Sequence, residues 1–311
     1  MVFDMEFQHY SVMLNECIEG LNIKPDGIYV DGTLGGAGHS YKIAERLNEK
    51  GRLIAIDKDL DAIEVSKERL KQFNNVTFIH DDYKNLPQIL DDLGIEKIDG
   101  ILLDLGVSSY QLDNRNRGFS YMGDAELDMR MNREQSLTAK EVVNNYSESE
   151  LVKIFFEYGE EKFSKKIASN IVKARPIEST GQLAEIIEKS YPAAVRFKGG
   201  NPCKRVFQAI RIEVNEELDG LYESLINMAR RLNTKGRMCV ITFHSLEDRM
   251  AKNAFQYLYC DCICPPHQPI CNCDKKREIE LITRKPIIPS EKELEENKRS
   301  QSAKLRIIEK I

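Results

Sequence analysis

A glycine-rich turn followed at a fixed distance by an acidic residue is the strongest chemical pattern in this sequence. A short apolar run ends at Asp31, and the turn Gly32-Thr33-Leu34-Gly35-Gly36-Ala37-Gly38-His39 follows directly. Glycines allow a sharp turn and a close approach of the backbone to a ligand, which the positive end of the next helix then faces. Asp57 ends the next apolar run, where a carboxylate can bind both hydroxyls of a ribose. The pattern predicts a nucleoside site.

Asp31 distinguishes between two kinds of nucleoside ligand. In a dinucleotide site the turn binds a pyrophosphate, which a carboxylate at this position would repel. S-adenosylmethionine has no phosphate and carries an ammonium and a sulfonium group, which a carboxylate attracts. Asp31 therefore favours S-adenosylmethionine over NAD, unless it is only a solvated strand end. Asp81, Asp82 and Tyr83 close the third apolar run, where the adenine would lie.

Asp104 is the candidate catalytic residue. It follows a fourth apolar run, and ligands bind at the carboxyl ends of strands in open α/β sheets. A carboxylate there could accept a hydrogen bond from an exocyclic amine and favour attack of the nitrogen on a methyl group. The alternative is that Asp104 only binds backbone donors of the next turn. His244, after the fifth apolar run, either contacts substrate or caps the following helix with Ser245.

A mainly parallel sheet is needed to bring these residues together. Apolar runs of strand length alternate with helix-period segments in the first third of the chain, and the alternation resumes near its end. We expect seven strands, over residues 27–31, 51–57, 76–80, 98–105, 237–243, 279–283 and 305–308, with the last two forming an antiparallel edge. Helices are expected over 40–47, 61–73 and 246–259, with one long amphipathic region over 206–232. The fold class predicted is α/β, with a doubly wound Rossmann-like methyltransferase sheet.

An all-helical domain is expected to interrupt this sheet after the fourth strand. Capping-box spacing at Thr138 and Ser147 begins two helices, and two more are expected over 161–174 and 182–189. The predicted domains are a methyltransferase domain over 1–111 and 206–311 and an inserted substrate-recognition domain over 112–205. Ten basic and three acidic residues lie between Lys162 and Arg205. This excess predicts contacts with nucleic acid phosphates, with a solvated helix face as the alternative.

The overall composition limits the class of protein. The 311 residues are 41% hydrophobic and 31% charged, with a mean hydropathy of −0.44, which is typical of a soluble chain of about two domains. No secretory signal and no apolar stretch of membrane length is visible, so we expect a cytoplasmic protein without membrane contact.

The cysteines are expected to be reduced rather than paired in disulfides, because the chain looks intracellular. Five of the eight crowd into one Pro-containing tract. A structural zinc site is one possibility for this tract, with ligands from Cys260, Cys262, Cys264, Cys271, Cys273 and His267. Their Cys-x-Cys spacings differ from the usual gaps of two to four residues, so the sequence favours a metal-free loop.

Nine segments spread along the chain resemble one known family. They are residues 9–16, 31–40, 103–109, 117–120, 127–131, 158–161, 207–211, 243–249 and 302–306. In the same order, they are similar to segments of the bacterial 16S ribosomal RNA cytosine-N4 methyltransferases, the MraW-type family. The resemblance implies methylation of the N4 amine of one cytidine in the decoding region of 16S rRNA. It implies S-adenosyl-L-methionine as cofactor, the small ribosomal subunit as partner, and no obligate protein partner.

The resemblance also implies which residues contact the cofactor. They are Ala37, Gly38, His39, Asp57, Tyr83, Asp104 and Gln111. Ala37 stands where many members of the family have glycine. Most amino methyltransferases carry an Asp/Asn-Pro-Pro-aromatic motif after the fourth strand, whereas this chain has Asp104-Leu105-Gly106-Val107. The role of Asp104 as acceptor for the amine is therefore a hypothesis.

Two other functions fit parts of the sequence. An RNA cytosine C5 methyltransferase needs a cysteine thiolate, and Cys203 offers one, although it lies in the insert rather than after the fourth strand. A non-catalytic ribosome-binding protein could retain a Rossmann-like core without the reaction. The intact glycine turn and Asp57 argue against this second alternative.

Overall fold

The structure is a computed structural model that describes residues 11–193, 200–265, 268 and 270–311. The chain separates into two compact units. Met1–Gly106 and Gly220–Ile311 form the first, called here the sheet unit, and Val107–Asp219 form the second, called the helical unit. Each is described by itself below.

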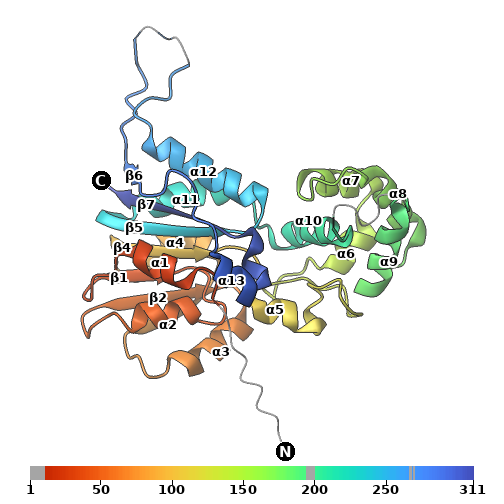
Figure 1. Ribbon diagram of the computed structural model, residues 1–311, viewed down its shortest axis with the longest axis horizontal. Helices are drawn as coiled ribbons and strands as arrows, with labels where there is room; N and C mark the ends of the chain where they lie inside the picture. The colour runs from red at the N-terminus through yellow and green to blue at the C-terminus, as the bar shows by residue number, and fades with distance from the viewer. Residues whose placement is uncertain (1–10, 194–199, 266–267, 269) are drawn as a thin grey trace, which may run out of the picture. The chain divides into compact units, whose positions relative to one another are not determined.

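The sheet unit contains seven strands within the described residues (Figure 1). They are β1 (Ile28–Asp31), β2 (Arg52–Asp57), β3 (Val76–His80), β4 (Ile98–Asp104), β5 (Leu232–Thr242), β6 (Ile279–Leu281) and β7 (Lys304–Lys310). Their order in the sheet is β3-β2-β1-β4-β5-β7-β6, in which β7 runs antiparallel to both of its neighbours and the other pairs are parallel. The predicted α/β class, the seven strands and the antiparallel edge are confirmed.

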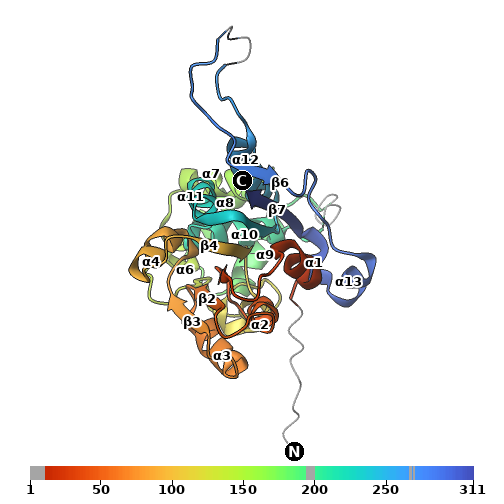
Figure 2. The same cartoon turned by 90° about the vertical axis from the view of Figure 1, so that its left-hand side faces the viewer.

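Helices cover both faces of this sheet, which explains why its central strands are almost entirely apolar. The helices of the unit are α1 (Leu14–Leu21), α2 (Gly38–Ala44), α3 (Leu60–Leu70), α4 (Leu86–Asp92), α11 (Leu221–Arg230), α12 (Ser245–Tyr259) and α13 (Glu291–Glu296). Side chains of α1 and α2 pack with Leu53, Leu102 and Ile241 of the sheet, and no solvent reaches these three residues. Figure 2 shows α4, α11 and α12 on the opposite face.

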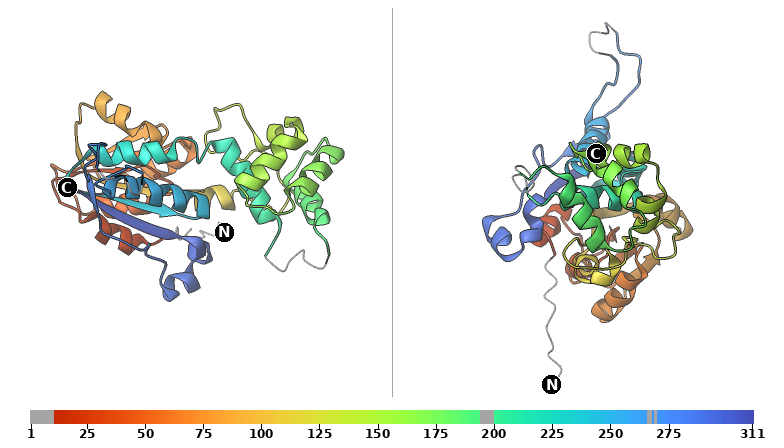
Figure 3. Two further views of the ribbon diagram at one scale, coloured as in Figure 1. Left: turned by 90° about the horizontal axis from the view of Figure 1, so that it is seen from above. Right: turned by 90° about the vertical axis from the view of Figure 1, so that its right-hand side faces the viewer.

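Six helices build the helical unit in the described part of the chain (Figure 3). They are α5 (Ser109–Asp113), α6 (Ala139–Asn145), α7 (Glu148–Glu157), α8 (Ser164–Ala174), α9 (Thr180–Ser190) and α10 (Cys203–Asn215). Both predicted capping boxes are present, with Thr138 beginning α6 and Ser147 beginning α7. The unit has its own core, which includes Leu151, Phe155, Ile167, Leu183 and Ile210.

The long amphipathic region expected over 206–232 contains two helices, α10 and α11, rather than one continuous helix. The first, α10, ends at Asn215, and Glu216 then takes a left-handed conformation with φ 50°. Gly220 is also left-handed, with φ 66°, and α11 begins at the next residue. Left-handed residues end helices, and the apolar periodicity on either side hides such a break from the sequence. The border between the units falls at this break.

None of the helices in the described ranges is both long enough and apolar enough to cross a membrane.

Candidate active site

Three aspartates lie side by side at one edge of the sheet. Asp57, Asp31 and Asp104 are the last residues of β2, β1 and β4, which are neighbours in that order and run parallel. Because the carboxyl ends of parallel strands meet at the same edge, these side chains face the region where open α/β sheets bind ligands.

The turn between β1 and α2 is fixed by backbone geometry. The N–H of Gly35 donates to Asp57 Oδ2 at 2.8 Å, which ties the turn to the neighbouring strand. Ala37 has a left-handed backbone with φ 58°, a conformation that glycine adopts more readily, and this explains why glycine also suits the position. A Cβ added at Gly38 would lie 1.8 Å from Ser11 Oγ, so a larger residue there would force Ser11 to shift.

Asp31 is a buried carboxylate. It is only 1% exposed, which rules out the alternative of a solvated strand end. Its carboxylate accepts hydrogen bonds from Ser40 Oγ at 2.7 Å and from the N–H of Thr33 at 3.2 Å. Burial raises the pKa of Asp31 to about 6, although these hydrogen bonds act to lower it. A cation placed nearby would stabilise the ionised form.

Asp57 is held by two backbone donors. Oδ2 accepts from Gly35 and Oδ1 accepts from the N–H of Asp59 at 2.9 Å. Burial raises the pKa of Asp57 to about 6, with smaller contributions in the same direction from the charges of Asp59 and Asp31. A carboxylate oxygen accepts two hydrogen bonds, so each oxygen retains capacity for one ribose hydroxyl.

Asp104 has an unsatisfied acceptor. Its Oδ1 is buried and has no hydrogen-bond partner among the described residues. Burial raises the pKa of Asp104 well above its ordinary value, and the charges of Asp31, Glu247 and Glu293 raise it further. A buried polar atom left without a partner costs about 1–3 kcal/mol, so a ligand donor at Oδ1 would remove this cost. The backbone of Asp104 is fixed separately, because its N–H donates to Thr33 Oγ1 at 2.6 Å.

His39 is oriented toward the same carboxylate. Its Nε2 lies 3.0 Å from the carbonyl oxygen of Val12, and since a carbonyl can only accept, Nε2 is the protonated nitrogen. In the neutral ring Nδ1 is then the acceptor, and it lies 3.9 Å from Asp104 Oδ2. His39 is 6% exposed, so its ring lies in the protein interior.

The other two residues implied as cofactor contacts lie in different units. Tyr83 begins the short helix η1 (Tyr83–Asn85) after β3, and its Cβ would be 2.9 Å from a Cβ added at Gly32. Tyr83 therefore packs against the first glycine of the turn. Gln111 belongs to the helical unit, where its Oε1 accepts from the N–H of Ser108 at 3.0 Å as part of the capping box of α5. Six of the seven implied residues thus belong to the sheet unit and Gln111 belongs to the helical unit, and the cofactor contacts of all seven stay predictions.

The electrostatics of this edge fit S-adenosylmethionine. Asp31, Asp57 and Asp104 repel one another while buried, which favours a cationic ligand and opposes a phosphate. Asp57 fits the ribose hydroxyls, the turn allows close approach, and Asp104 has an unused acceptor beside them. The residues that support this arrangement, Thr33 and Ser40, carry no signal in the sequence beyond their place in the turn.

We expect the affinity for S-adenosylmethionine to weaken as the pH falls through about 6. Asp31 and Asp57 have pKa values near 6 in the free protein, and a bound cation favours their ionised forms. Binding below that pH must therefore release protons, which costs up to about tenfold in affinity per pH unit for each carboxylate. Isothermal titration calorimetry between pH 5 and pH 8 would measure this, with a plateau expected above pH 7. A constant affinity over that range would contradict the assignment of these carboxylates to the site.

His244 has a capping role in the structure. The N–H of Glu247 lies 3.4 Å from His244 Nδ1, and Glu247 Oε2 accepts from the N–H of Phe243 at 2.8 Å. The two side chains form a reciprocal capping box at the start of α12. The partner of His244 in this cap is Glu247 rather than Ser245.

Cys203 is poorly suited to be a nucleophile. It begins α10 in the helical unit and is fully buried. Burial raises the pKa of its thiol to about 12, whereas attack on a pyrimidine ring needs the thiolate. This geometry does not support the C5 methyltransferase alternative.

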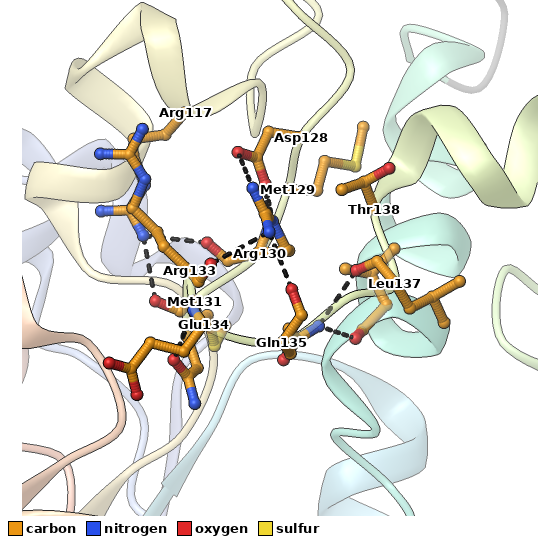
Figure 4. A network of polar contacts seen from close by, with 12 residues as sticks. Arg117, Asp128, Met129, Arg130, Met131, Arg133, Glu134, Gln135, Leu137 and Thr138 are labelled. Atoms are coloured by element: carbon orange, nitrogen blue, oxygen red, sulfur yellow. Dashed lines mark hydrogen bonds and ion pairs between the residues drawn. The ribbon is translucent and has the colours of Figure 1, made fainter.

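The segment 127–131, which resembles the family, forms a polar network in the helical unit (Figure 4). Arg130 binds both carboxylate oxygens of Asp128, at 2.7 and 3.1 Å, and donates to the carbonyls of Arg133 and Gln135. Nη2 of the buried Arg117 donates to the carbonyls of Arg130 and Met131, at 2.9 and 3.1 Å. The network fixes an irregular segment that has no strand or helix of its own.

Replacing Arg130 with alanine is expected to destabilise the helical unit by about 3 kcal/mol, because the largely buried carboxylate of Asp128 loses both side-chain donors and two carbonyls lose theirs. The carboxylate keeps only the backbone N–H of residue 130 as a donor. Urea unfolding followed by circular dichroism would measure the change. Arg133→Ala is the matched control, since Arg133 is exposed, and its hydrogen bond in the network is made by its backbone carbonyl. Its side chain acts on Asp128 only through its charge, as the last and smallest of the causes that shift the pKa of Asp128. Equal effects of the two substitutions would show that the network is not needed for stability.

Comparison with known proteins covers the whole chain. A profile of the MraW methylase family matches residues 6–311. Ribosomal RNA small subunit methyltransferase H of Lachnospira eligens is 58% identical over 315 residues, which cover 100% of both chains. The protein of the same name from Clostridioides difficile is 56% identical, over 99% of this chain and 100% of its own. Ribosomal RNA small subunit methyltransferase H 2 of Agathobacter rectalis is 58% identical over 98% of this chain and 99% of its own. The chain therefore belongs to the MraW methylase family.

Proposed function

We propose that this protein transfers a methyl group from S-adenosylmethionine to the N4 amine of one cytidine in the decoding region of 16S rRNA. The relatives are named as methyltransferases of small-subunit ribosomal RNA, which supports the substrate class. The single observation that carries the choice of an amine is the buried Oδ1 of Asp104, an acceptor without a donor at the edge that fits the cofactor. An exocyclic amine supplies such a donor.

Asp104 has the central part in the proposed mechanism. When bound, S-adenosylmethionine supplies a methyl group activated by the sulfonium charge. Asp104 accepts a hydrogen bond from the N4 amine, which localises the nitrogen lone pair for attack on the methyl carbon. Transfer would break the carbon–sulfur bond, leave its electrons on sulfur, and release one proton from N4. The raised pKa of Asp104 suits it to accept that proton.

The turn and Asp57 serve the same reaction by positioning. Transfer from a sulfonium needs little more than alignment of donor and acceptor, so rigid placement contributes most of the rate. The N–H groups of Gly35 and Asp59 both donate to the carboxylate of Asp57, which fixes the turn against the end of β2. We assign to these residues the binding of the ribose and of the cofactor backbone.

We assign RNA backbone binding to the helical unit. Lys162, Lys165, Lys166 and Lys173 lie on or next to α8 and are exposed, and the described residues give them no acidic partner within ion-pair distance. Unpaired cations on one helix are suited to phosphates, and strong salt dependence of binding is then expected. Arg175 is excluded from this role, because its guanidinium donates to the carbonyl of Val143 at 2.8 Å and holds the end of α8 in place.

Only some of the other basic residues between Lys162 and Arg205 can be added to this assignment. Lys204 and Arg205 are exposed at the start of α10. Arg196 and Lys198 lie outside the described residues, as do His9 and Tyr10 of the segments that resemble the family. The target base must also leave any stack or pair to reach the sheet edge.

Mass spectrometry of 16S rRNA digests tests the proposal directly. Cells lacking the gene should lose N4-methylcytidine from the decoding region, and the wild-type gene should restore it while Asp104→Asn does not. Loss of 5-methylcytidine instead would favour the C5 alternative. If no modified nucleoside changed although the protein still bound rRNA, it would be a non-catalytic binding protein.

A further inference from the structure

A cysteine quartet lies in the segment between α12 and β6, away from the site described above. Figures 1 and 2 show this segment leaving the end of α12 and returning to β6 at the edge of the sheet unit. Its described residues between Cys260 and Glu278 contain no helix or strand. Cys262 and Cys264 lie on the outgoing part of this segment, and Cys271 and Cys273 on the returning part.

The four sulfur atoms converge on one point. All of them lie within 4.8 Å of one another. The Sγ atom of Cys271 is 3.6 Å from that of Cys262, 3.8 Å from that of Cys264 and 3.5 Å from that of Cys273. The Sγ atoms of Cys262 and Cys273 are 3.8 Å apart. Each Cys-x-Cys pair therefore faces the other, an arrangement that the spacing alone does not reveal.

These separations match the edges of a metal tetrahedron. With zinc–sulfur bonds of about 2.3 Å, a tetrahedral site places its sulfur atoms about 3.8 Å apart. A disulfide would need about 2.05 Å, so no two of these cysteines are bonded to each other. Four thiolates in a tetrahedron are typical ligands of structural zinc.

Backbone donors support thiolates at two of the positions. The N–H of Ile263 donates to Cys273 Sγ, and the N–H of Cys264 donates to Cys262 Sγ, both at 3.4 Å. Hydrogen bonds of this kind orient metal ligands and stabilise their charge. Cys260 is not part of the group, because its Sγ lies 3.2 Å from the carbonyl of Tyr257. His267 lies outside the described residues.

We propose that Cys262, Cys264, Cys271 and Cys273 bind one Zn²⁺ ion, which fixes the fold of this segment. The proposal replaces the metal-free loop that the sequence favours, and it does not depend on the proposed methyl transfer. Zinc contributes folding free energy where a segment lacks regular structure and a core of its own. The ion closes the segment and leaves no coordination position for a substrate, so its role is structural.

Metal analysis of the full-length protein tests the proposal. Protein purified with a phosphine reductant, exposed to Zn²⁺ and passed through a desalting column is expected to hold one zinc per chain by plasma mass spectrometry. Cobalt(II) added to the metal-depleted protein should give the visible absorption of a tetrahedral cobalt–thiolate centre. Cys271→Ser should lose both signals, whereas the matched control Cys260→Ser should keep them.

Further measurements separate the loss of zinc from a general loss of the fold. All four cysteines are at least partly exposed, so Cys271→Ser should keep the helical content and thermal midpoint of the rest of the chain. Trypsin should cleave after the exposed Lys276 faster in Cys271→Ser than in the zinc-loaded wild type. Wild-type protein without zinc or a cobalt spectrum, zinc retained by Cys271→Ser, or another metal held in its place would each overturn the proposal.

Discussion

Replacing Asp104 with asparagine is expected to slow methyl transfer by about 10²–10⁴-fold, the range typical of a positioned acid–base group. The amide keeps the size of the carboxylate but carries no charge, and its nitrogen can only donate. It therefore accepts a hydrogen bond from the N4 amine more weakly and cannot take up its proton. The affinity for S-adenosylmethionine should change less than about tenfold, because the turn, Asp31 and Asp57 remain intact. Single-turnover kinetics and calorimetry measure the two quantities separately.

Asp92→Asn provides a control for this experiment. Asp92 is an exposed residue at the end of α4, and its carboxylate contacts only Gln88 among the described residues. The Asp92→Asn variant should leave both the rate of methyl transfer and the affinity for S-adenosylmethionine unchanged. If Asp104→Asn lowered affinity as much as turnover, Asp104 would be a cofactor ligand without a separate part in the reaction.

Replacing Asp57 with alanine should produce the opposite pattern. We propose that its carboxylate accepts hydrogen bonds from two ribose hydroxyls, and hydrogen bonds to a charged group contribute about 1.5–3 kcal/mol each. The substitution also leaves the N–H groups of Gly35 and Asp59 without their acceptor, which loosens the glycine turn. We expect the dissociation constant of S-adenosylmethionine to rise at least about 100-fold.

The rate at saturating cofactor should fall much less in Asp57→Ala than in Asp104→Asn. Asp57 contacts no reacting atom in the proposed mechanism. Its loss therefore raises the cofactor concentration needed for saturation and not the activation barrier of methyl transfer. Equilibrium dialysis gives the affinity, and initial rates over a wide range of cofactor concentrations give the limiting rate. An unchanged affinity in Asp57→Ala would remove the ribose assignment while leaving that of Asp104 standing.

The sheet could be predicted because burial on both faces marks its strands. β2 and β4 are nearly continuous apolar runs, and each ends in the aspartate that the sequence singled out. β5 begins at Leu232, five residues before its expected start at Arg237. The intervening residues include the exposed Lys235 with φ 69° and a register shift against β4, and such an irregular edge has no apolar alternation to detect.

Other features depend on contacts between distant segments, which the sequence does not show. Helix α13 is short and polar except for Leu294, yet its Glu293 accepts a hydrogen bond from the N–H of Met13 at 2.8 Å. The same carboxylate raises the pKa of Asp104, together with Glu247 of α12. The residue types at the site could thus be predicted from the ends of the strands. The charges that raise the pKa of Asp104, by contrast, come from elements remote in sequence.

The three aspartates at the ends of adjacent strands affect the stability of the protein when no cofactor is bound. The raised pKa values of Asp31, Asp57 and Asp104 mean that ionising them in the fold is unfavourable, so the empty protein loses stability as pH rises through their folded pKa values. A cationic cofactor then acts as the counterion of the folded chain and restores what ionisation removes. The gain in melting temperature on loading should therefore be larger at pH 8 than at pH 5.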